Sequence, residues 1–301
     1  MPTSSPPSSN TWSTGISRSA TTPPDVLNPA LSEHDEPSFL HEDERLVAVF
    51  KPSGWLVHPT ELDARESRVL LRWLRDRLGR RVFPVHRLDK PTSGPVLFAL
   101  DAATAAALAA DFASRRVAKR YLAVVRGHPP ETLTIDRPLS RIARTVPGPR
   151  DAEKTACTEV RRLATIELPW PNDRHPTSRY ALVACYPEGG RQHQIRRHLR
   201  HASYPLIGDT TYGHGLHNRL WRERLGVSRL LLTCCDLALR HPEGGSPLVL
   251  HALDPDFAAL ARRLGWEEAL SCIDEPQEDG MLTAKIAALA NAPALLPEDD
   301  A

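Results

Sequence analysis

The sequence predicts an α+β protein with a mostly antiparallel or mixed sheet. Apolar segments of strand length follow one another in runs, only a few segments show helical periodicity, and a regular alternation of strand and helix is missing. The chain has 301 residues, of which 41% are hydrophobic and 25% charged, so it can bury one large core or two small ones. We find no internal repeat, so each segment is interpreted separately.

The first segments are a strand and a helix. The run "RLVAVF" at 45–50 predicts a strand that ends at a Lys-Pro-Ser-Gly turn. The run "ESRVLLRWLRDRLG" at 66–79 places its apolar residues at helical spacing and ends on Gly79, which suits a C-terminal cap. A helix is therefore expected directly after the first strand and its turn.

Short strands at 82–85 and 95–100 flank a loop, and a helix is expected over 101–116 with Asp101 as its N-cap. The rest of the chain is dominated by apolar runs. The further strands are expected at 119–127, 158–167, 178–186, 229–239 and 247–253, and the further helices at 191–201 and 255–264. Strands grouped in this way favour antiparallel pairing over regular parallel winding.

The two ends of the chain differ from its centre in composition and in the order that we expect. Residues 1–38 are rich in Ser, Thr and Pro and hold few large apolar groups, so burial cannot offset the entropy lost on ordering them. We expect a disordered leader there, and its scarce positive charge argues against a transit peptide. The folded domain is expected at 39–272. Residues 273–301 are expected to form a loosely attached acidic tail with a short helix.

Charge is distributed unevenly. Residues 1–45 carry 2 basic and 7 acidic side chains, and residues 267–301 carry 1 and 9. Residues 46–266 carry 35 basic and 21 acidic ones, a net charge of +14. A basic centre is typical of a protein that binds a polyanion, since Lys and Arg attract phosphates and release their counterions. A soluble basic domain without such a partner is the alternative.

Cysteine usage and hydropathy narrow the class of protein. The 5 cysteines include no CxxC pair, which argues against a disulfide framework and a zinc ribbon. The chain shows no secretory signal pattern and no run of 18 apolar residues. We therefore expect a cytoplasmic protein with reduced thiols and no membrane contact.

The stretch "VHRLDKPTSG" at 85–94 places Asp89 between Arg87 and Lys90 in a loop rich in Pro, Thr, Ser and Gly. Such a loop presents a side chain rigidly. The flanking cations favour the charged carboxylate, which suits a nucleophile or a base rather than an acid. An isolated Asp in such a turn more commonly forms a salt bridge on the surface. Other residues must therefore decide whether Asp89 is catalytic.

A second dense stretch is "GGRQHQIRRHLRH" at 189–201, where paired glycines precede the expected helix. Helical spacing places Gln192, Arg196 and Leu199 on one face. If that face is buried, Arg196 needs an acidic partner. The histidines of the same stretch suggest a metal site, but no carboxylate or fourth ligand accompanies them, and a helix surface is the more common explanation.

The strand "KRYLAVVRG" at 119–127 places Tyr121 and every second residue after it on one face. If this face meets a nucleic acid, the ring of Tyr121 offers a flat surface on which a base can stack. A core tyrosine with a bonded hydroxyl is the alternative. The turn in "KPSGWLVHP" at 51–59 adds Lys51 to the candidates.

Together these stretches resemble the RluA-type pseudouridine synthases, from about Leu46 to about Leu253. Five motifs carry the resemblance, namely "KPSGWLVH" at 51–58, "HRLDKPTSG" at 86–94, which is similar to the family signature HRLDxxTSG, "KRYLAVVRG" at 119–127, "GRQHQIRRHL" at 190–199 and "YPLIGDTTYG" at 204–213. One departure is the pair Cys234 and Cys235, which stands where relatives usually have His-Ala. The residues expected to matter most are unaffected by it.

The resemblance implies the pseudouridine synthase fold, with helices and loops flanking a basic central cleft, for a catalytic domain at 39–272. It implies an isomerase that flips a uridine out of its stack and moves the uracil attachment from N1 to C5, without metal or cofactor. The likeness is greatest to family members that modify tRNA, which implies tRNA as the partner and uridine 65 as the target. We expect a monomer.

The resemblance also implies roles for single residues. Asp89 is the catalytic residue, Arg196 pairs with and orients it, and Tyr121 stacks near the uracil. Ile195 supports the base, and Arg87 fills the gap that the uridine leaves in the RNA. The other residues expected to contact RNA are His86, Lys51, Arg191 and Lys119. Whether Asp89 attacks C1′, stabilises positive charge there or takes a proton from C2′ stays open.

Other functions remain alternatives. The target can instead be ribosomal RNA or another tRNA site, or the chain can be an RNA-binding protein that has lost catalysis. The complete set Asp89, Tyr121 and Arg196 argues against lost catalysis, because binding alone needs no oriented acid. A loose likeness of "DKPTSG" to aspartyl-phosphate loops is not supported by a GxxxxGK[ST] loop or by an aspartate cluster for magnesium.

Overall fold

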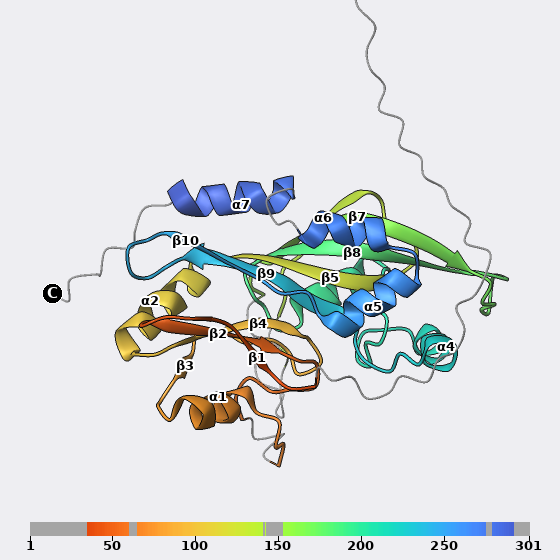
Figure 1. Cartoon of the computed structure of the whole chain (residues 1–301). Helices are drawn as coiled ribbons and strands as arrows, with labels where there is room; N and C mark the ends of the chain where they lie inside the picture. Colours follow the sequence, from red (N-terminus) through yellow and green to blue (C-terminus); the bar gives the residue numbers. More distant parts are fainter. Residues whose placement is uncertain (1–34, 60–64, 141, 143–152, 275–278, 292–301) are drawn as a thin grey trace, which may run out of the picture.

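The computed structural model describes residues 35–59, 65–140, 142, 153–274 and 279–291. Two antiparallel sheets form its centre, and helices cover them (Figure 1). The expected disordered leader lies outside the described residues except for its last positions, the final one of which begins a strand. The expected α+β class with antiparallel sheets is confirmed.

The smaller sheet has four strands in the order β1-β2-β4-β3, and each neighbouring pair is antiparallel. These strands are β1 (Ser38–Glu42), β2 (Leu46–Lys51), β3 (Phe83–Pro84) and β4 (Gly94–Ala99). Every residue of β2 and β4 is buried. Both faces of this sheet therefore need a cover.

Two helices supply part of that cover. α1 (Leu70–Leu78) packs with Val47 and Val49 on one face, and α2 (Ala102–Ala113) packs with Leu46 and Ala48 on the other. The predicted C-terminal end of α1 and the predicted N-cap of α2 are both confirmed. Gly79 ends α1 in the left-handed conformation, and the Asp101 carboxylate accepts a hydrogen bond from the Thr104 backbone N–H at 2.8 Å.

The larger sheet has six antiparallel strands in the order β10-β9-β5-β8-β7-β6. Its strands are β5 (Ala118–Arg126), β6 (Thr132–Asp136), β7 (Cys157–Leu168), β8 (Ser178–Glu188), β9 (Leu232–Arg240) and β10 (Pro247–His251). The predicted alternation of β5 is confirmed, because Ala123 and Val125 belong to one apolar cluster and Leu122 and Val124 to another.

Five more helices pack on the larger sheet or its edges. They are α3 (Gln194–His201), α4 (Gly215–Leu225), α5 (Pro255–Arg263), α6 (Glu267–Asp274) and α7 (Gly280–Asn291). No helix in the described part of the chain is long and apolar enough to cross a bilayer. Sequence patterns did not predict β1, β6, α4 or α6.

The prediction that residues 273–301 form a loosely attached tail is wrong for those of them that the structure describes. Asp279 is buried and binds the guanidinium of Arg120 on β5 at 2.8 Å, and Leu282 is fully buried in the core beside the larger sheet. In Figure 1, α7 lies along this sheet on the side away from the smaller one. A buried ion pair and apolar contacts thus attach this segment firmly.

The two sheets meet where β4 begins. The Cys234 backbone N–H of β9 donates to the Ser93 carbonyl at 2.8 Å, and the Arg229 guanidinium donates to the Ser93 hydroxyl at 3.0 Å. Gly94 has φ +130°, and a Cβ there would lie 2.3 Å from the Cys234 carbonyl oxygen. Only glycine allows this close approach. The loop before β4 is therefore fixed to both sheets.

Candidate active site

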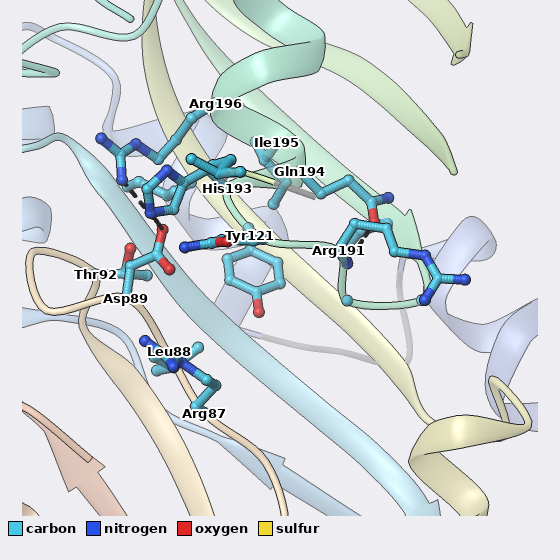
Figure 2. A pocket seen from close by; sticks show the side chains of 16 residues that line it. Arg87, Leu88, Asp89, Thr92, Tyr121, Arg191, His193, Gln194, Ile195 and Arg196 are labelled. Carbon is cyan, nitrogen blue, oxygen red and sulfur yellow. Dashed lines mark hydrogen bonds and ion pairs between the residues drawn. The ribbon is translucent and has the colours of Figure 1, made fainter. Parts of the chain in front are cut away.

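A cavity of about 310 Å³ lies at this junction, a size at the small end of ligand pockets (Figure 2). The loop before β4 forms one wall, and the start of α3 forms the other, with β5 between them. Its lining includes Arg87, Leu88, Asp89, Thr92, Tyr121, Gly190, Arg191, His193, Ile195 and Arg196. Segments far apart in the sequence thus meet around one space.

Asp89 and Arg196 meet in this cavity, as the sequence predicts. The carboxylate oxygen Oδ2 of Asp89 accepts a hydrogen bond from Nη1 of Arg196 at 3.2 Å. The Asp89 side chain is 21% exposed, whereas that of Arg196 is 6% exposed. The carboxylate therefore remains accessible to a ligand while its cationic partner is shielded from water, which strengthens their attraction.

A second carboxylate holds Arg196 more completely. Asp209 accepts from Nε at 2.7 Å and from Nη2 at 2.9 Å, a two-point geometry that fixes the plane of the guanidinium. The backbone N–H groups of Thr211 and Tyr212 donate to the same carboxylate, at 2.9 Å each. Burial opposes the charge of Arg196, but the Asp209 hydrogen bonds outweigh it and raise the Arg196 pKa. Arg196 is thus a permanent, immobile cation.

His193 stands on the other side of the Asp89 carboxylate, with Nε2 3.7 Å from Oδ2. Its Nδ1 lies 3.0 Å from the Tyr212 hydroxyl. If that hydroxyl donates, the ring proton is on Nε2 and faces Asp89. Burial lowers the pKa of His193, so the neutral ring prevails at neutral pH. His193 has a left-handed backbone, φ 54°, in the turn that starts α3.

Tyr121 extends from β5 into the same cavity, beside Asp89 and Ile195 (Figure 2). It pairs across the sheet with Cys234. Burial raises the pKa of Tyr121 well above its usual value, so the phenol stays protonated at neutral pH. Its ring offers a neutral, flat wall, and Ile195, which is 6% exposed, adds an apolar one.

Arg191 and Lys119 flank the glycine turn before α3. Arg191 lines the cavity, and its backbone N–H donates to the Gln194 side chain at 3.0 Å. Lys119 is buried, and its ammonium donates to the Gly189 carbonyl at 2.5 Å. Burial lowers the pKa of Lys119 to about 8. Lys119 therefore supports the turn from behind, and the expectation that it contacts RNA is not supported by its position.

Lys51 and His86 also lie outside the cavity, contrary to expectation. Lys51 is fully buried, and its ammonium donates to the carbonyls of Pro52, Trp55 and Lys90 at 2.8–3.2 Å. Nε2 of His86 accepts from the Leu97 backbone N–H at 2.9 Å. The backbone needs these side chains as hydrogen-bond partners. These contacts position the loop that carries Asp89, and the full burial of Lys51 argues against its contact with RNA, whereas contact by the partly exposed His86 stays a prediction.

The cations that flank Asp89 in sequence are not its partners. Lys90 pairs with Glu66 at 2.7 Å, and the Arg87 side chain lies apart from the Asp89 carboxylate (Figure 2). Arg87 is exposed at the cavity rim, where RNA can reach it. The explanation of Asp89 by its sequence neighbours is therefore wrong, and the cation that matters comes from α3.

The histidines of α3 point to separate partners. His198 bonds to the Thr158 hydroxyl at 2.9 Å and the Arg137 carbonyl at 3.0 Å. His201 contacts the Arg137 guanidinium at 2.6 Å. Among the residues that the structure describes, no group of three His, Cys, Asp or Glu side chains is placed to hold a metal ion.

Sequence reasoning missed the roles of Asp209, Gln194 and Tyr212. The helix begins at Gln194, so Gln192 is exposed before it and does not share the predicted buried face with Arg196. Gln194 is the buried glutamine and donates to the Cys157 carbonyl at 2.8 Å. The signal for Asp209 was present, because it is the acid within the "YPLIGDTTYG" motif and a buried arginine requires such a partner.

The arrangement suits chemistry at a positively polarised carbon. It offers one accessible carboxylate, a fixed guanidinium beside it, and a neutral aromatic ring with an apolar floor for a planar group. Arginines at the rim attract an anionic ligand. A carboxylate held in this way can attack, remove a proton or stabilise positive charge.

Comparison with known proteins gives a consistent result. Residues 45–201 match the family model described as RNA pseudouridylate synthase. The chain is 42% identical over 236 residues to the tRNA pseudouridine synthase C of Vibrio cholerae, covering 77% of this chain and 97% of that protein. It is 41% identical to the protein of the same name from Salmonella typhi, covering 77% and 91%.

Solved structures share the fold. Human RNA Pseudouridylate Synthase Domain Containing 4 superposes with a TM-score of 0.56 at 26% identity, covering 75% of this chain and 92% of that one. Human RNA Pseudouridylate Synthase Domain Containing 1 superposes with a TM-score of 0.60 at 23% identity, covering 79% and 90%.

Proposed function

Because the chain belongs to the RNA pseudouridylate synthase family, and to its RluA branch, we propose that it isomerises a uridine of tRNA to pseudouridine. The similarity to proteins named tRNA pseudouridine synthase C supports tRNA as the substrate. The target that we propose is uridine 65. The observation that carries the proposal is the Asp89–Arg196 contact inside a cavity rimmed by arginines.

The reaction breaks the N1–C1′ bond and forms a C5–C1′ bond. The proton on C5 is released and N1 gains one, so substrate and product are isomers and no electrons are transferred. Asp89 faces the ribose in this proposal, and the three routes open to a carboxylate all require its ionised form. Arg196 favours that form by its charge, while Asp209 prevents the guanidinium from moving away.

The uracil lies between Tyr121 and Ile195 while it turns. A protonated phenol with a raised pKa cannot act as a base at neutral pH, so the ring acts as a stacking surface. Arg87, exposed at the rim, is placed to enter the RNA stack that the uridine leaves. Flipping costs a few kcal/mol, which contacts between the basic surface and the phosphates offset.

The test is Asp89→Asn, with Asp76→Asn, an exposed carboxylate on α1, as the control. We expect Asp89→Asn to abolish pseudouridine formation in tRNA and to leave tRNA affinity within about threefold, because Asn keeps the shape but lacks the charge. Asp76→Asn should match the wild type in both respects. Turnover by Asp89→Asn at the wild-type rate would remove Asp89 from the mechanism.

Two outcomes decide between this proposal and its alternatives. Pseudouridine mapping of cellular RNA, with and without the protein, should show loss at position 65 of tRNA. Loss at a ribosomal position or at another tRNA position would replace the proposed target. If the wild-type protein binds tRNA but modifies no RNA, it is a binding protein on this fold.

A further inference from the structure

A second cavity of about 690 Å³ lies at the other end of β5. Arg126 and Gly127 at the end of β5 line it, together with the loop between β7 and β8 and the start of α4. The rest of its lining comprises Asn172, Asp173, Arg174, His175, Pro176, Thr177, Arg179, His214, Leu216 and His217. Nothing in the proposed reaction uses this space.

The lining of the second cavity is polar and carries a positive charge that Asp173 offsets only in part. In the described part of the chain, no carboxylate forms an ion pair with Arg126 or Arg174. Arg179 pairs with Glu167 at 3.0 Å, and Asp173 is the one acidic side chain of the lining. The charge available to an anion therefore comes from Arg126 and Arg174.

The loop that carries Arg174 is held in shape. The Asn172 side chain donates to the Thr177 carbonyl at 2.7 Å and accepts from the backbone N–H groups of Arg174 and His175 at 3.1 Å each. On the opposite wall, His217 is 6% exposed and bonds through Nδ1 to the buried Tyr180 hydroxyl at 2.9 Å. The cavity walls are thus fixed in place before any ligand arrives.

α3 extends from the first cavity toward the second. α3 starts at the first cavity with Arg196, and beyond its end Ser203 accepts a hydrogen bond from Arg126 of the second. Arg200 is exposed on the last turn of α3. Burial lowers the pKa of His214, and the charges of Arg126 and Arg200 lower it further, while Asp173 raises it.

The spacing fits one nucleic-acid ligand. The side chains of Tyr121 and Arg126 leave opposite faces of β5, but α3, whose eight residues span about 12 Å at roughly 1.5 Å per residue, runs from the first cavity toward the Ser203 carbonyl that Arg126 contacts. An RNA with one base in the first cavity can therefore place backbone phosphates at the second.

We propose that the second cavity binds backbone phosphates of the same RNA whose uridine enters the first cavity, with Arg126 and Arg174 as the phosphate ligands. This inference rests on the proposed function. The neutral His214 and His217 rings add hydrogen-bonding groups without charge. The contact contributes affinity for RNA that is long enough to reach both cavities, and it does not take part in the chemical step.

The experiment compares wild type with the double variant Arg126→Gln, Arg174→Gln. The control is Arg222→Gln, Arg224→Gln, which removes two exposed arginines of α4 that do not line the cavity. Kd for unfractionated tRNA is measured at several salt concentrations, and turnover is measured at saturating tRNA. A short stem-loop that contains the target uridine but ends before the second cavity serves as the second substrate.

We expect the cavity variant to raise the Kd for tRNA by roughly tenfold and to reduce the slope of log affinity against log salt by about 1 for each arginine. Turnover at saturation and affinity for the stem-loop should stay at the wild-type values, and the control should match wild type throughout. An unchanged Kd and slope for tRNA in the cavity variant would overturn the inference while the proposed function stands. A wild-type protein that modifies no RNA would contradict the proposed function instead.

Discussion

At the scale of single residues, Arg196 holds the candidate site together, because it binds carboxylates from two distant loops at once. Its guanidinium contacts Asp89 and Asp209 and lies over the Tyr212 ring, 5.2 Å from the centroid. The exposed Arg200 is four residues further on the same helix and has none of these contacts. Comparing substitutions of Arg196 and Arg200 therefore separates the effect of an arginine's position from the effect of its charge.

We expect Arg196→Ala to lower kcat by at least about 100-fold, because the Asp89 carboxylate loses the cation that orients it. It should also lower the free energy of unfolding by about 3 kcal/mol, since Asp209 is left buried and unpaired. Arg200→Ala should change stability by less than about 0.5 kcal/mol and leave kcat unchanged. Single-turnover assays and urea denaturation test this, and equal kcat values for the two variants would contradict it.

His86 makes the stability dependent on pH. Burial lowers the pKa of His86 from about 6.5 to about 3, so between these values the unfolded chain binds a proton that the native protein does not. The free energy of unfolding must therefore fall as pH is lowered through this window. We expect a contribution of up to about 1.4 kcal/mol per pH unit, which His86→Gln removes. Urea denaturation between pH 6.5 and 4 measures it, and identical slopes for the two proteins would be inconsistent with a ring that stays neutral in the native protein.

The family resemblance correctly implied that Asp89, Arg196, Tyr121 and Ile195 are neighbours, which the residue patterns alone had left open. It failed where a side chain's partner is far away in the sequence. Lys51 resembles an RNA ligand in its motif, yet its ammonium binds carbonyls of the loop instead. The periodicity of a single segment carries no information about such contacts.

At the scale of elements, strands with continuous apolar runs and helices with clear caps were predictable. β6 was missed although its sequence, TLTID, alternates polar and apolar residues strictly, because five residues with only two apolar side chains give a weak signal. α4 was missed because polar and basic residues cover most of its surface, and its contact with the core depends on a few residues such as Trp221. The start of α3 was misplaced because His193 adopts a left-handed conformation that no pattern indicates.

Gly94 tests how the junction of the two sheets supports the site. Gly94→Ala places a Cβ against the Cys234 backbone, so we expect β4 to move away from β9, a loss of about 3 kcal/mol or more and a large fall in kcat. Gly79→Ala is the control, since Gly79 also has positive φ, +61°, but nothing lies within 4 Å of its Cβ position. It should cost about 1 kcal/mol and leave kcat unchanged. Similar losses of activity in both variants would show that the close approach is not what matters.

At the scale of the whole molecule, a buried ion network joins the C-terminal segment to the larger sheet. Arg120 on β5 binds Asp236 at 2.6 Å, Asp279 at 2.8 Å and the Ile273 carbonyl at 2.7 Å. All three charged side chains are fully buried. The segment was expected to be loose because its composition is acidic, but one of its acids is the counterion of a core arginine.

Asp279→Ala should lower the free energy of unfolding by about 3–5 kcal/mol, because Arg120 keeps a buried charge with incomplete compensation. Lys285 lies on the same segment as Asp279 and forms a partly exposed ion pair with Glu159 of β7. Lys285→Ala removes this pair and should lower the free energy of unfolding by less than about 1 kcal/mol. Chemical denaturation of both variants measures the difference. Equal losses would mean that α7 is held by its apolar contacts rather than by the network.

The bond between Ser93 and Cys234 has a consequence for how activity arises. The acid is carried by one sheet, while the arginine and the tyrosine are carried by the other, so neither half holds a competent centre by itself. A chain in which the two sheets have not docked therefore lacks the contact between Asp89 and Arg196. Catalytic rate is consequently a sensitive reporter of complete folding.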